Sequence, residues 1–145
     1  MVFSISPHAR TIAANPLVVP EANAAVLLST LAARAAGDPF PLVKSPNCVT
    51  CGISVVLKAI DDAFGLDSVA VTTFQALSGR GDAKYEPHLV VGNVYPLTGT
   101  AEKTDDYQRA ELQRIFPTLR RCTVAAHRVP VQVGFRTPLP TALYS

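Results

Sequence analysis

The chain has 145 residues, of which 48% are hydrophobic and 17% charged, and its formal net charge is +2. This length can bury one core, and the composition excludes a largely disordered chain. The thirteen basic residues are scattered, so neither a nucleic-acid nor a membrane partner is expected. We therefore expect a single domain over residues 1–145, ending in an irregular tail at 136–145.

Hydrophobic periodicity along the chain predicts strands that alternate with helices. Strands are expected at residues 2–5, 17–19, 41–44, 68–77, 88–94, 121–126 and 128–133. Helices are expected at residues 21–36, 49–64 and 102–115. Neither a signal peptide nor a transmembrane span is recognisable, and three cysteines, an odd number, indicate a reducing cytoplasmic setting.

The most informative position is a cysteine at the start of the second predicted helix. Pro46 ends the preceding strand, and Asn47 is a favourable N-cap for the periodic apolar run that follows. Cys48 is therefore expected at the first helical position, where free backbone N–H groups and the helix dipole favour an anion such as a thiolate. The same N–H groups could hold an oxyanion. The alternative is a buried cysteine that packs as a small hydrophobe.

Cys48 and Cys51 also form a C-x-x-C pair, the spacing of disulfide oxidoreductases and of half a zinc site. The flanking residues are not thioredoxin-like, and no histidine stands at ligand spacing from the pair. We expect Cys51 and Cys122 to be packing residues, and we expect no metal.

Several motifs, in order along residues 2 to 135, resemble those of the aspartate-semialdehyde dehydrogenase family. They are Pro16-Leu17-Val18-Val19-Pro20-Glu21-Ala22-Asn23, Pro46-Asn47-Cys48-Val49-Thr50, Thr72-Thr73-Phe74-Gln75-Ala76-Leu77-Ser78-Gly79 and His127-Arg128-Val129-Pro130-Val131. The resemblance implies the fold of that family's catalytic and dimerisation half. This fold is α+β, with a mixed, largely antiparallel sheet covered by helices, and it implies a homodimer or a larger even oligomer.

The resemblance also assigns catalytic roles. Cys48 matches the nucleophile that forms a thioacyl-enzyme, and Asn47 belongs to the turn that helps to hold the oxyanion. Gln75 matches the glutamine that orients the substrate, although it could simply pair within a sheet.

Substrate-binding roles fall on four further positions. Arg128 matches the arginine that clamps the substrate carboxylate, and Glu102 and Lys103 match an acidic-then-lysine segment that contacts substrate and phosphate. Arg128 and Lys103 could instead be surface charges, and Thr100-Ala101 departs from the family's acidic residues. Phe135 stands where the family has its catalytic histidine, and a benzyl ring cannot transfer a proton.

A second departure concerns the cofactor. The sequence contains no G-x-G-x-x-G, and Gly79-Arg80-Gly81 leads into a polar run instead of an apolar helix. We therefore expect no nucleotide cofactor and a catalytic half that stands alone.

Three functional hypotheses follow. The first is a non-redox enzyme for a small carbonyl, carboxylate or thioester substrate, acting as an isomerase, cyclase, hydrolase or acyl transferase, for example in specialised-metabolite biosynthesis. The second is a pseudoenzyme that serves as a binding or assembly module. The third is part of an NADP-dependent aspartate-semialdehyde dehydrogenase.

Overall fold

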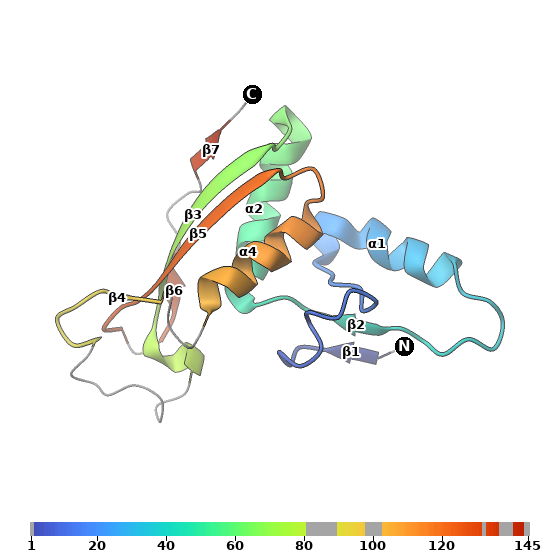
Figure 1. The fold of residues 1–145 in the computed structure, drawn as a ribbon, viewed down its shortest axis with the longest axis horizontal. Coiled ribbons are helices and arrows are strands. Elements are labelled where there is room, and N and C mark those ends of the chain that lie inside the picture. Colours follow the sequence, from blue (N-terminus) through green and yellow to red (C-terminus); the bar gives the residue numbers. More distant parts are fainter. Residues whose placement is uncertain (1, 81–89, 98–102, 132, 137–140, 144–145) are drawn as a thin grey trace.

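The computed structural model describes residues 2–80, 90–97, 103–131, 133–136 and 141–143. Its helices are α1 (Pro20–Ala32), α2 (Cys48–Phe64), the short 3-10 helix η1 (Leu77–Arg80) and α4 (Thr104–Ile115). Its strands are β1 (Val2–Ser4), β2 (Leu42–Lys44), β3 (Ser68–Gln75), β4 (Tyr95–Pro96), β5 (Arg121–Arg128), β6 (Phe135–Arg136) and β7 (Thr141–Leu143). The mixture of helices and sheets confirms the α+β class (Figure 1).

The larger sheet has the order β4-β5-β3-β6, with β7 also paired to β3. Its longest pairing, β3 with β5, is parallel, whereas β4, β6 and β7 join it in antiparallel orientation. The sheet is therefore mixed, as the resemblance implied. A parallel pair needs a crossover connection, and α4 lies in the connection between β3 and β5.

One face of this sheet packs against α2 and α4. Buried residues alternate along β3 and β5 because side chains on a strand point to opposite faces in turn. The core joins residues from both strands, α2, α4 and neighbouring loops: Leu17, Val19, Ala22, Val49, Ile53, Leu57, Leu66, Val69, Val71, Leu112, Ile115, Phe116, Leu119 and Val124. On the opposite face of the sheet, Ala70 and Thr123 are exposed.

Helix α2 runs from Cys48, the first helical position expected from the N-cap, to Phe64, and so begins one residue before the predicted range 49–64. Its N-cap is Asn47, whose side chain accepts a hydrogen bond from the Val49 N–H. It ends at Gly65, whose φ of 77° is readily adopted only by glycine. In the view of Figure 1, α2 begins in the lower half, the direction in which β3 and β5 run.

A smaller part of the chain holds β1, β2 and α1. β1 and β2 form a two-stranded parallel sheet, and α1 extends away from the larger sheet (Figure 1). Asn23 has non-helical φ and ψ angles inside α1. Its side chain accepts from the Val19 N–H and donates to the Leu17 carbonyl, and so fixes the turn that starts the helix.

Four predicted strands need correction. Residues 17–19 make only a single bridge, between Leu17 and Lys44, because Pro16 and Pro20 leave no room for a ladder. Residues 90–94, the described part of the strand predicted at 88–94, form a turn. The strands predicted at 121–126 and 128–133 are one strand that ends at Arg128, two residues before Pro130.

The segment expected to be an irregular tail contains strand residues. β6 and β7 both pair with β3 in antiparallel orientation, and the register of β7 is shifted by one residue relative to that of β6. The residues from Pro138 to Pro140 lie outside the described residues.

Candidate functional site

The cysteine turn presents Cys48 to solvent. Cys48 is the first residue of α2 and is exposed, whereas Val49 and Thr50 beside it are buried. Its Sγ lies 3.8 Å from Asn47 Oδ1, and the same oxygen accepts from the Val49 N–H at 2.9 Å. The alternative of a buried, packing cysteine is therefore wrong, and the thiol is placed where a reagent can reach it.

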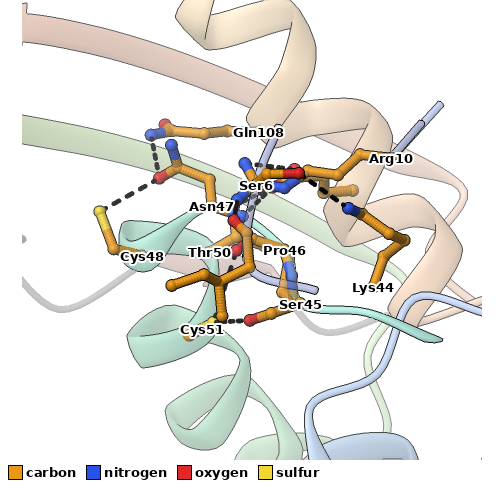
Figure 2. Close-up of polar contacts among 12 residues, drawn as sticks. Ser6, Arg10, Lys44, Ser45, Pro46, Asn47, Cys48, Thr50, Cys51 and Gln108 are labelled. Carbon is orange, nitrogen blue, oxygen red and sulfur yellow. Dashed lines mark hydrogen bonds and ion pairs between the residues drawn. The ribbon is translucent and has the colours of Figure 1, made fainter. Parts of the chain in front are cut away.

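Helix α4 supports this turn from the inside. The Gln108 Nε2 donates to Asn47 Oδ1 at 3.5 Å, so that Cys48 and Gln108 approach the same oxygen from different sides (Figure 2). One turn further along α4, Glu111 Oε2 accepts from the Asn47 N–H at 2.8 Å and from the Thr50 hydroxyl at 2.7 Å. The turn is thus held by buried polar groups of a second helix.

A second group of predicted residues lies in a row across the larger sheet. Gln75 on β3 is the register partner of Arg128 on β5. Phe135 pairs with Gln75 on its other side, and Tyr95 pairs with Arg128. The structure therefore brings together three predicted site residues that are widely separated in the sequence.

Arg128 and Gln75 are buried rather than open to solvent. Arg128 is 2% exposed and Gln75 is 7% exposed. The Arg128 Nη1 donates to the Ala76 carbonyl at 2.9 Å, and the Gln75 Nε2 donates to the Thr73 hydroxyl at 3.2 Å. A Cβ on Gly79 would lie 3.1 Å from Arg128 Nη1, so glycine lets the guanidinium approach the backbone of η1. The alternative of a surface charge is therefore wrong for Arg128.

The structure says less about the three remaining predicted site residues, Lys103, Glu102 and Phe135. Lys103 is exposed and adopts a left-handed conformation (φ 48°) just before α4, so the predicted helix start at 102 is two residues early. Glu102 lies outside the described residues. Phe135 is placed by its backbone, beside Gln75.

The histidines of the described residues do not replace the missing acid–base group. His127 stacks on Phe74 with ring centroids 5.4 Å apart, and both residues alternate with the buried positions of their strands. They therefore lie on the face of the sheet opposite Arg128. His8 is exposed in the segment that follows β1.

The two other cysteines are partly buried. Cys51 packs against the core, with its Sγ 3.6 Å from the Ser45 hydroxyl and 3.8 Å from the Pro46 carbonyl. Burial raises the pKa of the Cys122 thiol to about 11, against an opposing effect of the Arg109 charge. Both positions agree with the predicted packing role. Within the described ranges there is no cluster of three or more His, Cys, Asp or Glu residues suited to a metal ion.

Sequence reasoning missed the α4 residues that hold the turn. Gln108 and Glu111 are three residues apart, 0% and 7% exposed, in a helix predicted from its apolar stripe. The sequence does place these two polar residues on the same face of the helix as its apolar residues. That placement indicates polar contacts with another element, because buried polar groups require partners. Among the described residues, the buried Gln108 Oε1 and Arg10 Nε have no hydrogen-bond partner.

The fold and the site together define an α+β domain that presents a cysteine at the start of a helix, on a turn fixed by a neighbouring helix. Aspartate-semialdehyde dehydrogenase from Rickettsia bellii is 31% identical, and the alignment covers 92% of this chain and 45% of the relative. The enzyme from Methanothermobacter thermautotrophicus is 32% identical over 82% of this chain and 36% of its own length. Over the matched part, the chain belongs to the aspartate-semialdehyde dehydrogenase family.

The structural comparison agrees with the sequence comparison. The crystal structure of aspartate-semialdehyde dehydrogenase II from Vibrio cholerae superposes with a TM-score of 0.70 and 27% identity. This superposition covers 92% of the chain and 46% of the Vibrio chain. No protein-family model matches the chain. The chain spans less than half the length of these curated relatives, so the activity of the whole enzymes does not transfer directly.

Proposed function

We propose that this protein is a non-redox enzyme in which Cys48 attacks the carbonyl carbon of a small, carboxylate-bearing substrate. The observation that carries the proposal is the exposed Cys48 at the first position of α2, on a turn fixed by Asn47 and α4. A thiolate is a strong nucleophile, and the start of a helix stabilises negative charge on the attacked oxygen. Cys48 is the proposed catalytic residue, and Asn47 shapes its turn.

A thioester is the substrate class that this chemistry handles without an oxidant. The Cys48 sulfur forms a bond to the carbonyl carbon, and the tetrahedral intermediate then expels the substrate's thiolate, which takes up the proton lost by Cys48. The S-acyl-cysteine passes its acyl group to water or to another acceptor. An aldehyde would stop at a reversible hemithioacetal, because its oxidation needs a hydride acceptor.

Arg128 and Gln75 are the proposed substrate-binding pair. Their adjacency on β3 and β5 supports the assignment, since a guanidinium can bind a carboxylate through two parallel hydrogen bonds. Because Arg128 is buried, η1 must shift to admit the substrate, since Gly79 lies against the guanidinium. Lys103 and Glu102 are retained as proposed contacts near the start of α4, and Phe135 as an apolar contact beside Gln75.

Two matched thioesters test the proposal. Succinyl-N-acetylcysteamine carries a carboxylate, and acetyl-N-acetylcysteamine lacks one. Intact-mass spectrometry should detect acylation of Cys48 by both, with the succinyl compound reacting faster. Cys48→Ala should abolish the adduct, whereas Cys51→Ala, which removes a thiol from the same turn, should retain it. Equal labelling of Cys122, or no adduct at all, would contradict the proposal and leave a binding or assembly module.

A second candidate is part of an NADP-dependent aspartate-semialdehyde dehydrogenase. The partial coverage of the relatives favours it. This candidate requires a nucleotide-binding partner, so it predicts that the chain oxidises aspartate semialdehyde only when a separate NADP-binding domain of a related dehydrogenase is added together with NADP. Cytoplasmic placement is proposed for both candidates, and the three free cysteines are compatible with a reducing compartment. None of the described helices is long and apolar enough to cross a membrane.

A further inference from the structure

The Cys48 turn rests on a buried carboxylate that belongs to another helix. Glu111 lies in the middle of α4 and is 7% exposed. Its Oε2 accepts both the Asn47 N–H and the Thr50 hydroxyl hydrogen, on either side of Cys48 in the sequence. The first turn of α2 contains no acidic residue of its own. Glu111 therefore places a negative charge against the turn that carries Cys48.

A buried carboxylate in this position would offset the attraction of the helix start for an anion unless a positive charge compensated it. Arg10 provides that charge, since its Nη1 lies 3.7 Å from Glu111 Oε1. The two side chains are 17% and 9% exposed, so water screens the pair only weakly. Arg10 also donates to the Ile5 carbonyl through Nη2 at 2.7 Å, which holds the guanidinium in place.

We propose that the Arg10–Glu111 pair controls the nucleophilicity of Cys48, with Glu111 anchoring the turn and Arg10 cancelling the charge that this anchor introduces. Both are positioning residues, because they act through the turn and not on a substrate. The inference rests on the proposed role of Cys48 as nucleophile. It adds that the segment following β1 tunes the thiol through the Glu111 carboxylate that it shares with the turn.

Two other cations lie close to this pair and must be separated from it. The Lys44 Nζ donates to the hydroxyls of Ser4 and Ser6, beside Arg10 (Figure 2). Arg114, three residues after Glu111 on α4, donates to the Arg10 and Asn15 carbonyls. Neither forms an ion pair with Glu111 among the described residues. Arg114 is therefore a matched control for loosening the same segment while removing one positive charge.

The test measures the rate of Cys48 alkylation by iodoacetamide at pH 7 and low ionic strength, resolved by peptide mass spectrometry. Glu111→Gln keeps an acceptor oxygen for Asn47 and Thr50 but removes the charge, so alkylation should become about threefold faster or more. Arg10→Met leaves the carboxylate uncompensated, so alkylation should become slower by a similar factor, about threefold. Arg10→Lys should restore most of the rate. The double variant, which lacks both charges, should react at close to the rate of the unsubstituted chain.

The opposite signs distinguish charge control from simple loosening of the turn. Loosening would move both single variants in the same direction, and that result would overturn the inference, as would rates unchanged by either substitution. Arg114→Met should leave the Cys48 rate close to that of the unsubstituted chain. Raising the salt concentration should shrink the differences, since screening weakens charge effects. Alkylation reports the thiol itself, so these outcomes stay interpretable even if the thioester experiment shows no turnover.

Discussion

Gln75 and Arg128 lie directly opposite each other on the parallel strands β3 and β5, although 53 positions separate them in the sequence. Both are buried on the face of the sheet that packs against α2 and α4. Their adjacency depends on the crossover through α4, because no hairpin can join parallel strands. The helix that carries Glu111 and Gln108 thus also determines that Arg128 stands next to Gln75.

Gly79→Ala should displace Arg128 without unfolding the protein. The new Cβ would sit 3.1 Å from Nη1, so the guanidinium must move by a few tenths of an ångström and its 2.9 Å bond to the Ala76 carbonyl must weaken. We expect a loss of about 1 kcal/mol in the free energy of unfolding, measured with urea. The Nε–H signal of Arg128 should shift in side-chain NMR spectra. Ser78→Ala is the control, and an unchanged Arg128 signal in Gly79→Ala would contradict the prediction.

The cysteine turn was predictable from the sequence because its signals are local. Pro46, Asn47 and the apolar repeat fix the helix start within a few residues, and the structure differs by one position. The polar support from α4 was not predictable in this way. Whether Gln108 and Glu111 point to the core or to solvent depends on how α4 crosses α2, and a single helical pattern does not specify that crossing.

The strand predictions were wrong where strand formation depends on whether a neighbouring strand pairs with the segment. β5 continues through His127 because Phe74 and Pro96 pair with it on either side, whereas residues 90–94 have a similarly apolar sequence and form a turn. The expectation of an irregular tail could not anticipate that β3 offers an edge with which Thr141–Leu143 pairs.

Cys122 should make stability fall at alkaline pH. Its thiol has a pKa of about 11 in the folded protein because burial disfavours the thiolate, compared with 9.0 for the unperturbed group. Between these values the unfolded chain loses the proton while the folded protein keeps it. Stability is therefore fully present below pH 9 and decreases as the pH rises toward 11.

Urea denaturation at about pH 8 and about pH 10 measures this effect. Other groups titrate in the same range, so the informative quantity is the difference between variants. Cys122→Ala should lose less stability over this interval than the unsubstituted chain. Cys51→Ala should behave like the unsubstituted chain. An identical alkaline loss in Cys122→Ala would show that the thiol does not contribute.

The open face of the larger sheet should mediate self-association. Ala70 and Thr123 are exposed there, and Phe74 and Ala125 are only partly covered. A face of small and aromatic side chains is suited to a two-fold contact with a second copy. We expect a homodimer or a larger even assembly by light scattering, and Thr123→Arg should dissociate it. Ala24→Arg, on the exposed side of α1, is the control. A mass near 15.4 kDa for the unsubstituted chain at micromolar concentration would contradict the prediction.

Phe135→His should fail to create dehydrogenase activity, although it places a histidine at the position that the family resemblance assigns to the catalytic acid–base. Phe135 pairs with Gln75 on the sheet, so the substitution would put a histidine in the strand next to a proposed substrate-binding residue. Hydride transfer, however, needs a bound nucleotide, and the sequence lacks a Gly-rich phosphate loop. Mixing the variant with NADP and aspartate semialdehyde should give no increase in NADPH absorbance. Calorimetry should detect no NADP binding to either protein.

The variant should also acylate more slowly with the succinyl thioester, because a polar ring replaces an apolar contact, whereas Phe135→Leu should retain most of the rate. A micromolar dissociation constant for NADP, or NADPH formation by Phe135→His, would instead favour a dehydrogenase part that needs only its histidine restored.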